Sequence, residues 1–376
     1  MVRILKLSVI FYLAVFAWAC KKDIVPDETQ SESFVKLFGG SPTDNAMDMI
    51  VDGGNVAIAG TMKSSVSKAV LICTDKNGNQ QPWSPLFVGG SQSIAANKIV
   101  KTSDGGYIVI GTQQKSADNK DIFVSRVSSA GIEEWTRYFG GVYNEGGNFG
   151  LELSAGGYVI GGYTESYGNG FKDIYLVRID RDGNEIWQST IGFGSNESGN
   201  DIVELNGWLY VLGYTESLGI AANMFVVQVS SATGKGVNFN YFPNAETYSG
   251  SKIGMLPGDK MVLLGVGNSS SYVNCISEDL SSVWEATTPT KEVYNGLAVN
   301  GNSIYMVGSK QNQEGISEIL IDQYNLNGSK TGSEVISSYG NLKATDVSFF
   351  SDGKICISGV ATVGNISQIF LIKKEI

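Results

Sequence analysis

The stretch Tyr158-Val-Ile-Gly-Gly162 is one of seven short apolar segments that contain or end on a glycine and recur along the 376-residue chain. The other six read VAIAG, YIVIG, LYVLG, MVLLG, IYMVG and ICISG, and the seven recurring glycines are Gly60, Gly111, Gly162, Gly213, Gly265, Gly308 and Gly359. Consecutive glycines are 51, 51, 51, 52, 43 and 51 residues apart. A period of this length, built on strand-like segments, is typical of a radial array of small sheets that pack against their neighbours.

The repeat around Tyr158 shows the predicted unit most fully. A first strand over 149–153 leads through a tight turn into the apolar strand 158–162, and a polar loop leads to a third strand over 173–179. A further turn leads into a fourth strand that carries Trp187. Asp-Gly and Asn-Gly pairs favour such turns because glycine adopts positive φ without steric cost. The sequence therefore predicts an all-β, seven-bladed β-propeller of four-stranded blades.

The two ends of the repeat array complement each other. The seventh unit stops after its third strand, near 369–372, and therefore lacks a fourth strand. At the other end, Phe34-Val-Lys-Leu-Phe-Gly-Gly matches the fourth strand of the second repeat, Trp135-Thr-Arg-Tyr-Phe-Gly-Gly. We expect the N-terminal strand to complete blade 7 and close the ring, which also removes an exposed strand edge.

These motifs resemble the bacterial seven-bladed β-propeller repeat family. The shared pattern is Phe-Gly-Gly, a polar loop, an apolar strand, Asp-Gly-Gly, a strand ending in glycine, an Asp-aromatic strand, a turn and Trp, and it covers roughly residues 33–376. The resemblance implies the propeller fold, and it implies no single activity because function on such folds resides in grafted sites.

The first 32 residues have a different character. Residues 1–19 combine Arg3 and Lys6 with an apolar run and an Ala-x-Ala pattern, which predicts a secretory signal peptide. Cys20 follows directly, as in bacterial lipoproteins, so we expect it to carry the lipid anchor; ordinary cleavage with a free Cys20 is the alternative. Lys21-Lys22-Asp23 resembles the tag that sends lipoproteins of the Bacteroidota to the cell surface. Residues 20–32 then predict a lipidated cysteine and a flexible tether before the propeller at 33–376.

This anchor predicts a protein held at the outer membrane by its N-terminal lipid and exposed at the cell surface. A periplasmic-facing or secreted protein is the alternative. The 27 basic and 37 acidic residues give a net charge of −10, and an acidic surface argues against nucleic-acid binding. The three remaining cysteines, Cys73, Cys275 and Cys356, lie in predicted strands, and we expect buried free thiols.

The chain contains no histidine, which excludes histidine-dependent nucleophilic catalysis and imidazole metal ligands. No phosphate-binding or dinucleotide-binding motif is present, so we expect no cofactor. Asp180-Arg-Asp-Gly-Asn184 resembles the start of a calcium loop but lacks the glutamate at the twelfth position. We interpret it as a hairpin turn and expect no metal site.

The candidate ligand-binding residues lie in loops that emerge on one face of a propeller. Aromatic rings with carboxylates and amides between them are suited to sugars, and glycoside hydrolysis needs paired carboxylates. The glutamates also recur at the repeat period, which favours a structural role, with hydrogen bonds to backbone amides between neighbouring blades, over a ligand site. The candidates are Tyr143, Glu145, Tyr163, Glu165, Tyr167, Glu197, Tyr214 and Glu216.

These observations favour a non-enzymatic surface lipoprotein. Its propeller would act as a docking platform for a protein partner, and it could be an accessory subunit of an outer-membrane complex. The alternative is a carbohydrate-binding or carboxylate-dependent carbohydrate-active surface protein. No catalytic residue is assigned.

Overall fold

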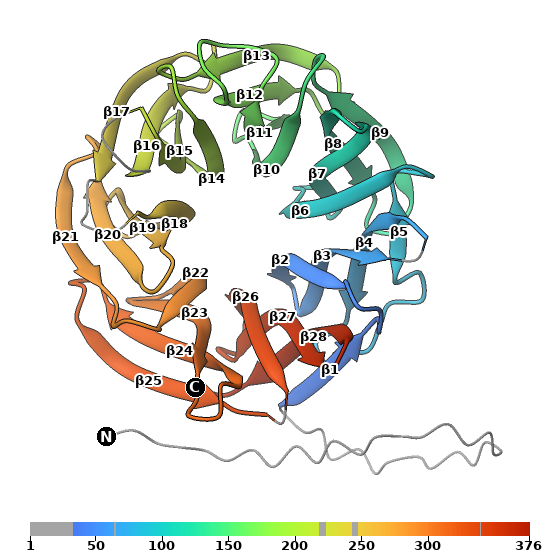
Figure 1. The fold of residues 1–376 in the computed structure, drawn as a ribbon, viewed down its shortest axis with the longest axis vertical. Helices are drawn as coiled ribbons and strands as arrows, with labels where there is room; N and C mark the ends of the chain where they lie inside the picture. The colour runs from blue at the N-terminus through green and yellow to red at the C-terminus, as the bar shows by residue number, and fades with distance from the viewer. Residues whose placement is uncertain (1–32, 64, 218–222, 243–246, 339) are drawn as a thin grey trace.

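The fold is a ring of seven small sheets (Figure 1). It is taken from a computed structural model, which describes residues 33–63, 65–217, 223–242, 247–338 and 340–376. Within these ranges the regular elements are 28 β-strands, and each sheet contains four antiparallel strands. The predicted seven-bladed, all-β propeller is confirmed. The predicted signal peptide, the predicted lipid attachment at Cys20 and the predicted tether lie outside the described residues.

Each blade orders its strands from the central channel outward. Blade 1 is β2 (Asn45–Asp52), β3 (Asn55–Lys63), β4 (Ser67–Thr74) and β5 (Leu86–Val88); blade 2 is β6 (Ser93–Lys101), β7 (Tyr107–Ser116), β8 (Asn119–Val127) and β9 (Glu133–Phe139). Blade 3 is β10 (Glu145–Glu152), β11 (Tyr158–Thr164), β12 (Asp173–Ile179) and β13 (Glu185–Ile191); blade 4 is β14 (Glu197–Leu205), β15 (Trp208–Thr215), β16 (Asn223–Ser230) and β17 (Gly236–Phe242).

The remaining blades follow the same order. Blade 5 is β18 (Ser249–Leu256), β19 (Lys260–Val266), β20 (Ser271–Ser277) and β21 (Ser282–Thr287); blade 6 is β22 (Val293–Asn300), β23 (Ser303–Gln311), β24 (Ser317–Asn325) and β25 (Lys330–Ile336). Blade 7 is β26 (Asn341–Phe349), β27 (Ile355–Val363), β28 (Ile366–Lys374) and, outermost, β1 (Phe34–Phe38).

Blade 7 closes the ring with both ends of the chain. Strand β1 pairs antiparallel with β28, from Phe34 opposite Lys373 to Phe38 opposite Ile369. The predicted closure by the N-terminal strand is therefore confirmed. The outer edge of β28 is covered by β1, so no blade is left one strand short.

The recurring glycine has a specific steric cause. The innermost strand of every blade contains a β-bulge, and the glycine on the second strand lies directly beside it. A Cβ on Gly111 would lie 1.9 Å from the backbone oxygen of Ala95, and one on Gly162 would lie 2.0 Å from that of Gly146. Any side chain would collide with the bulged backbone, so only glycine fits. Blade 5 is the exception, because a Cβ on Gly265 has no neighbour closer than 3.1 Å.

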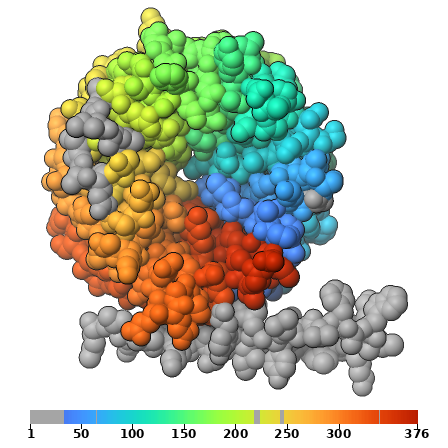
Figure 2. Space-filling model, in the orientation of Figure 1, coloured from blue at the N-terminus to red at the C-terminus, as the bar shows by residue number. Residues whose placement is uncertain are grey.

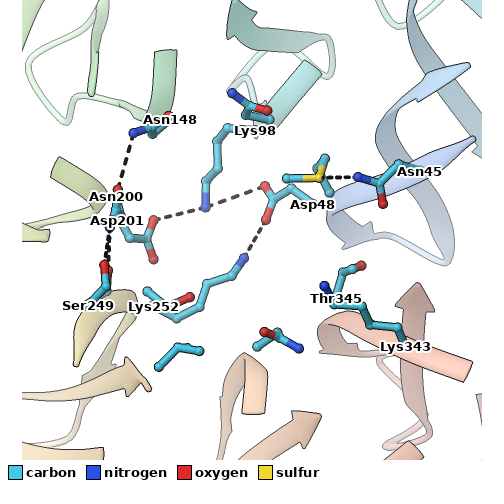
Figure 3. A pocket seen from close by; sticks show the side chains of 16 residues that line it. Asn45, Asp48, Lys98, Asn148, Asn200, Asp201, Ser249, Lys252, Lys343 and Thr345 are labelled. Carbon is cyan, nitrogen blue, oxygen red and sulfur yellow. Dashed lines mark hydrogen bonds and ion pairs between the residues drawn. The ribbon is translucent and has the colours of Figure 1, made fainter. Parts of the chain in front are cut away.

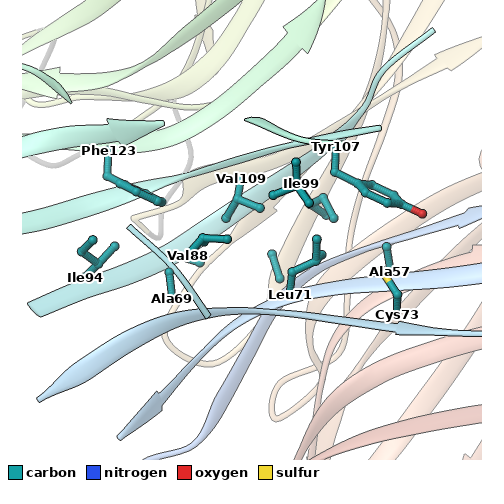
Figure 4. Close-up of a cluster of buried hydrophobic side chains, with 13 residues drawn as sticks. Ala57, Ala69, Leu71, Cys73, Val88, Ile94, Ile99, Tyr107, Val109 and Phe123 are labelled. Atoms are coloured by element: carbon teal, nitrogen blue, oxygen red, sulfur yellow. The ribbon is translucent and has the colours of Figure 1, made fainter. Parts of the chain in front are cut away.

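The apolar core is divided among the junctions between blades. Seven clusters of buried side chains occur, one for each pair of adjacent blades. The cluster between blades 1 and 2 contains Leu71 of β4, Val109 of β7 and Phe123 of β8 (Figure 4). Because each blade packs on two neighbours, every junction contributes to the stability of the ring.

Two smaller predictions are confirmed by the structure. Cys73, Cys275 and Cys356 are free and buried. The segment that resembles a calcium loop is the hairpin turn between β12 and β13. There Asp180 Oδ1 accepts hydrogen bonds from the backbone amides of Asp182 and Asn184, and Oδ2 accepts one from the Asn184 amide group.

Candidate functional site

The predicted ligand-binding residues gather on one face of the ring, which we call the loop face. It carries the loops between the second and third strands of a blade and those that lead from one blade to the next, because antiparallel strands end alternately at the two faces. The backbone amide of Glu165 donates to the carbonyl of Asn144, and that of Glu216 donates to the carbonyl of Asn196, each at 2.9 Å. The two kinds of loop are thus joined at successive blades.

Glu145 lies beneath these loops, with no exposed surface. Its Oε2 accepts a hydrogen bond from the backbone amide of Gly141 at 2.7 Å. Its Oε1 accepts from the Thr164 hydroxyl at 2.7 Å and from the backbone amide of Ser166 at 3.2 Å. The carboxylate therefore fastens two loops to each other, and both of its oxygens are occupied.

Glu197 repeats this arrangement one blade further on. It is also fully buried and accepts from the backbone amide of Phe193 at 2.9 Å and from the hydroxyls of Thr215 and Ser217 at 2.7 and 2.6 Å. Asp44 occupies the same place in blade 1 and accepts from the backbone amides of Gly40 and Lys63, among others. An acidic residue that holds two loops together is therefore a repeated structural feature of the loop face.

Glu165 and Glu216 lie nearer the surface. Glu165 Oε2 accepts from the Asn144 amide group at 2.8 Å, and Glu216 Oε2 accepts from the Asn196 amide group at 2.7 Å. Lys172 approaches Glu165 at 3.6 Å. These two glutamates therefore remain accessible to a ligand, whereas Glu145 and Glu197 do not.

Tyr163 and Tyr214 stand beside the accessible glutamates and are half-buried. Burial raises the pKa of both phenols, and the negative charges of Glu165 and Glu216 respectively raise it further. Both rings are therefore uncharged near neutral pH. The ammonium group of Lys172 lies 4.5 Å from the centre of the Tyr163 ring, a cation–π contact that orders this part of the loop face.

Exposed apolar side chains form a patch on the same loops. Tyr143, Tyr167, Phe171 and Phe193 expose 59, 41, 75 and 42 % of their surface, and Val142 exposes 73 %. We call these five residues the aromatic patch. The loops that carry them are adjacent, because the Tyr143 amide donates to the Ser166 hydroxyl, the Tyr167 hydroxyl donates to the Gly140 carbonyl, and the Phe171 amide donates to the Ser195 carbonyl.

Phe171, Phe193 and Val142 were not among the residues predicted from sequence. Their signal was present, since each is an apolar residue within a polar loop. Carboxylates and tyrosines indicate a ligand chemistry in the sequence, whereas side chains without polar atoms indicate none. Exposure of large apolar residues at one place is a more direct indication of an interaction surface.

The buried glutamate provides a first testable prediction. Glu145→Ala removes three hydrogen bonds and leaves buried donors unpaired, so we expect it to lower the free energy of unfolding by about 2–4 kcal/mol. Glu165→Ala and Glu216→Ala, at accessible positions, should each lower it by less than about 1 kcal/mol. Urea unfolding followed by circular dichroism measures all three. Equal losses at Glu145 and Glu165 would contradict the assignment of Glu145 to the scaffold.

The central channel is a second polar site, with a cavity volume of about 470 Å³. It is lined by the bulge residues of the innermost strands, among them Asn97, Asn148 and Asn200 (Figure 3). Each of these amide groups donates to a backbone carbonyl of the next blade, at 2.8–3.0 Å. The bulge therefore turns a side chain into the channel, and in these three blades that side chain links the blade to the next one.

Charged residues adjacent to the bulges form an ion network across the channel (Figure 3). Lys252 Nζ lies 2.7 Å from Asp48 and 3.2 Å from Asp346, and Lys98 Nζ lies 3.1 Å from Asp201 and 3.5 Å from Asp48. The three aspartates also accept backbone amides of the following blade at 3.0–3.1 Å. The charges are thus paired within the protein, and the network joins blades 1, 2, 4, 5 and 7.

Two further properties limit the kinds of site in the described part of the chain. There, no group of three or more Cys, Asp and Glu side chains is placed to hold a metal ion. Among the same residues, no helix has the length and hydrophobicity to span a membrane.

No protein-family model and no curated protein matches the sequence. Solved structures match in fold. A protein of unknown function from Dyadobacter fermentans aligns with a TM-score of 0.53 and 9% identity, over 90% of this chain and 98% of that one. A protein of unknown function from Bacteroides caccae aligns at 0.47 and 10%, over 81% and 94%. A prolyl endopeptidase aligns at 0.48 and 15%, over 87% of this chain but 46% of that one.

These similarities concern the propeller fold alone. At 9% identity, the Dyadobacter protein carries no information on the side chains of the loop face or the channel. The function has to be inferred from the sites of this chain itself.

Proposed function

We propose that the protein is a non-enzymatic lipoprotein of the outer membrane or cell surface, and that its loop face docks a protein partner. The observation that carries this proposal is the aromatic patch. Large apolar side chains at 41–75 % exposure, gathered on adjacent loops, are typical of a surface that another molecule covers. The partner could be a subunit of an outer-membrane complex, to which this chain would be an accessory subunit.

The scaffold beneath the patch supports docking. Glu145 and Glu197 hold the loops from below, and the closed ring holds the blades. A rigid surface loses little conformational entropy on binding, so apolar contacts contribute more to affinity. The same two carboxylates are unavailable as a hydrolytic pair, because their oxygens accept hydrogen bonds from the loops.

Cys20 is the residue we propose as the lipid attachment point, on the basis of its place after the predicted cleavage point. Acylation at this position would hold the protein in the membrane without a membrane-spanning segment. Mass spectrometry of the mature N-terminus tests this part separately. An unmodified cysteine would leave the docking surface intact and remove the anchor.

Phe171 is the residue that tests docking most directly. In cells crosslinked mildly before purification, we expect Phe171→Asp to reduce recovery of the partner by about tenfold or more, since a charge in the centre of an apolar interface costs over 1.4 kcal/mol. Ile132→Asp is the matched control, because Ile132 is 63 % exposed and lies in a hairpin of the opposite face. Recovery of the wild-type protein without a partner, or equal losses for both variants, would contradict the proposal.

A glycan is the second candidate ligand. The Tyr163 and Tyr214 rings stand beside Glu165 and Glu216, each of which holds an asparagine amide, and rings next to such polar groups suit sugar recognition. A glycan array with purified protein separates the two ligand classes. Binding that is lost in a Glu165→Ala, Glu216→Ala double variant with unchanged folding would favour the carbohydrate.

A further inference from the structure

An aromatic residue on the outer strand, or just before it in blade 1, packs against the next blade at most junctions. Trp135 of β9 packs on Gly183 in the β12–β13 hairpin of the next blade, where a Cβ would lie 3.1 Å from the indole. The contacts of Trp83, Trp187 and Trp284 with Gly131, Gly234 and Gly328 are equivalent, and Phe34 packs in the same way on Gly78. Five junctions are thus closed by a ring from one blade on the hairpin glycine of the next.

The junction between blades 4 and 5 is sealed in a different way. Asn238 replaces the aromatic residue there, opposite Gln228. The hairpin of blade 5 carries Leu280 where the other hairpins carry glycine, and Leu280 is 2 % exposed within the apolar cluster of this junction. At five other junctions an aromatic ring of the preceding blade fills this space. Here the Leu280 side chain fills it from the hairpin of blade 5.

The junction between blades 6 and 7 has neither the aromatic ring on the outer strand nor a hairpin residue that replaces it. Gly332 stands where most of the outer strands carry the ring, since it pairs with Gln323 as Trp187 pairs with Arg178. In the described part of the chain, blade 7 also has no hairpin between its third and fourth strands, because β28 and β1 are not consecutive strands. Neither the aromatic side chain nor the hairpin on which it packs is therefore present among the described residues between blades 6 and 7, next to the blade that closes the propeller.

An apolar groove of about 530 Å³ lies at this junction. Its walls include Ile336 of β25 together with Val35 and Leu37 of β1. A salt bridge between Lys374 and Glu334 crosses from one blade to the other. Val35 is 40 % exposed. Leu37 and Ile336 pack on the buried cluster between these blades on one side only. The side that faces the groove lacks dispersion contacts, so an apolar occupant would stabilise this junction.

The position of Ser33 indicates which segment is nearest. Ser33 itself lines the groove, so the N-terminal segment begins at its rim. Between Cys20 and Ser33 the sequence is KKDIVPDETQSE, in which Ile24-Val25-Pro26 is the apolar part. We propose that Ile24 and Val25 dock in the groove between blades 6 and 7 and supply the apolar side chains that Gly332 omits.

The length of the intervening chain permits this contact. Six residues, 27–32, separate Pro26 from Ser33, and they span up to about 20 Å when extended. A flexible linker of this length has a root-mean-square span of about 13 Å and presents the segment at an effective concentration in the millimolar range. Weak apolar contacts are therefore sufficient, and Pro26 lowers the entropy that is lost on docking.

Docking of this segment would determine which side of the propeller faces away from Cys20. It would hold the edge formed by blades 6 and 7 close to Cys20 and leave blades 3 and 4, which carry the aromatic patch, on the other side of the ring (Figure 2). Docking requires the groove and the apolar residues of the segment, and it requires neither lipidation nor a partner.

Hydrogen exchange of the mature chain, residues 20–376, tests the proposal. The variant Ile24→Asp/Val25→Asp makes docking unfavourable, and Thr29→Asp/Gln30→Asp adds the same charge at polar positions of the same segment. We expect amides of 33–37 and 334–338 to exchange about three- to tenfold faster in the first variant than in the wild type, and to be unchanged in the second. All substitutions lie outside the propeller, so its folding is preserved.

A groove-filling variant gives an independent measurement. Gly332→Trp introduces the ring that other junctions contain, on the strand face that also presents Glu334 and Ile336 to blade 7. We expect this variant to make exchange in the groove insensitive to Ile24→Asp/Val25→Asp. Equal exchange in the wild type and the first variant, or equal acceleration in both charge variants, would overturn the proposal.

Discussion

Deletion of residues 31–40 is expected to remove the cooperative thermal unfolding of the whole propeller or to lower its midpoint by about 10 °C or more. The deletion removes β1, which pairs with β28 over five residues. It also removes Phe38 from the apolar cluster between blades 7 and 1, and Phe34 from Gly78. The loss of one buried and one partly buried aromatic side chain alone amounts to several kcal/mol, and a domain is stable by only about 5–15 kcal/mol.

The effect should spread beyond blade 7 because the ring has no other closure. Without β1, the edge of β28 is exposed, including the row that contains Phe370 and Leu371. An uncovered apolar strand edge favours aggregation as well as unfolding. Differential scanning calorimetry measures both the midpoint and the reversibility of the transition.

Deletion of residues 21–30 is the matched control, with the same number of residues removed. These residues precede the propeller, so the midpoint should fall by at most a few degrees, the amount that docking in the groove between blades 6 and 7 would contribute. Unchanged thermal unfolding of the 31–40 deletion would contradict the closure of the ring by β1.

The sequence predicted the fold well because the repeat records a steric constraint. A glycine beside the bulge is required in six of the seven blades. A repeated bulge therefore produces a glycine that recurs in the sequence at the repeat period. Blade 5, where Gly265 lacks this contact, is also the repeat with the irregular 43-residue spacing to Gly308. The strand that closes the ring could be found because it keeps the pattern of the outer strands.

The site was less predictable, for reasons that are equally physical. A bulge inserts one residue and reverses the alternation of side chains, so the inward direction of Asn97 and its equivalents is not evident from strand periodicity. The ion network joins Asp48 to Lys252, 204 residues away, and only the closed ring brings them together. The charges at 48, 98, 201, 252 and 346 do share the repeat period, which would have identified them.

The recurring loop glutamates are residues that the sequence did identify but whose role it could not decide. Glu145 and Glu197 have the residue type and spacing of a ligand site, yet both are fully buried and hold loops together. Residue type identifies a possible chemistry, and burial decides whether a ligand can reach it. Phe171, with no chemistry of its own, is the more accessible residue.

Asp48→Ala is expected to lower the free energy of unfolding by about 3–5 kcal/mol, the usual cost of removing one partner from a buried ion pair. Asp48 is 3 % exposed, and it accepts hydrogen bonds from Lys252 and from the backbone amide of Ile99. Its loss leaves Lys252 with Asp346 alone and Lys98 with Asp201 alone. Asp52→Ala is the matched control, because the Asp52 side chain is 53 % exposed in its pair with Lys101 and should contribute less than about 1 kcal/mol.

The pH dependence of stability separates loss of charge from loss of packing. Burial acts to raise the pKa of Asp48, but the ammonium groups of Lys252 and Lys98 outweigh it and lower the pKa to about 2. Asp48 therefore stabilises the fold above pH about 4, and this contribution disappears as the pH falls toward 2. Burial raises the pKa of Asp346 to about 6, with the charge of Asp48 adding to the effect. Asp346 therefore binds a proton more tightly in the folded state, and its contribution declines as the pH rises from about 4 to 6.

Asp48→Ala should flatten both limbs of this profile. The acid limb disappears with the carboxylate, and the second limb weakens because the pKa of Asp346 falls once the neighbouring negative charge is gone. Urea unfolding of the wild type and the variant between pH 2 and pH 7 measures the difference directly. Two profiles that run parallel over this range would show that Asp48 acts through packing alone. A difference that grows from pH 2 to pH 4 would assign the stabilisation to the charges that cross the channel.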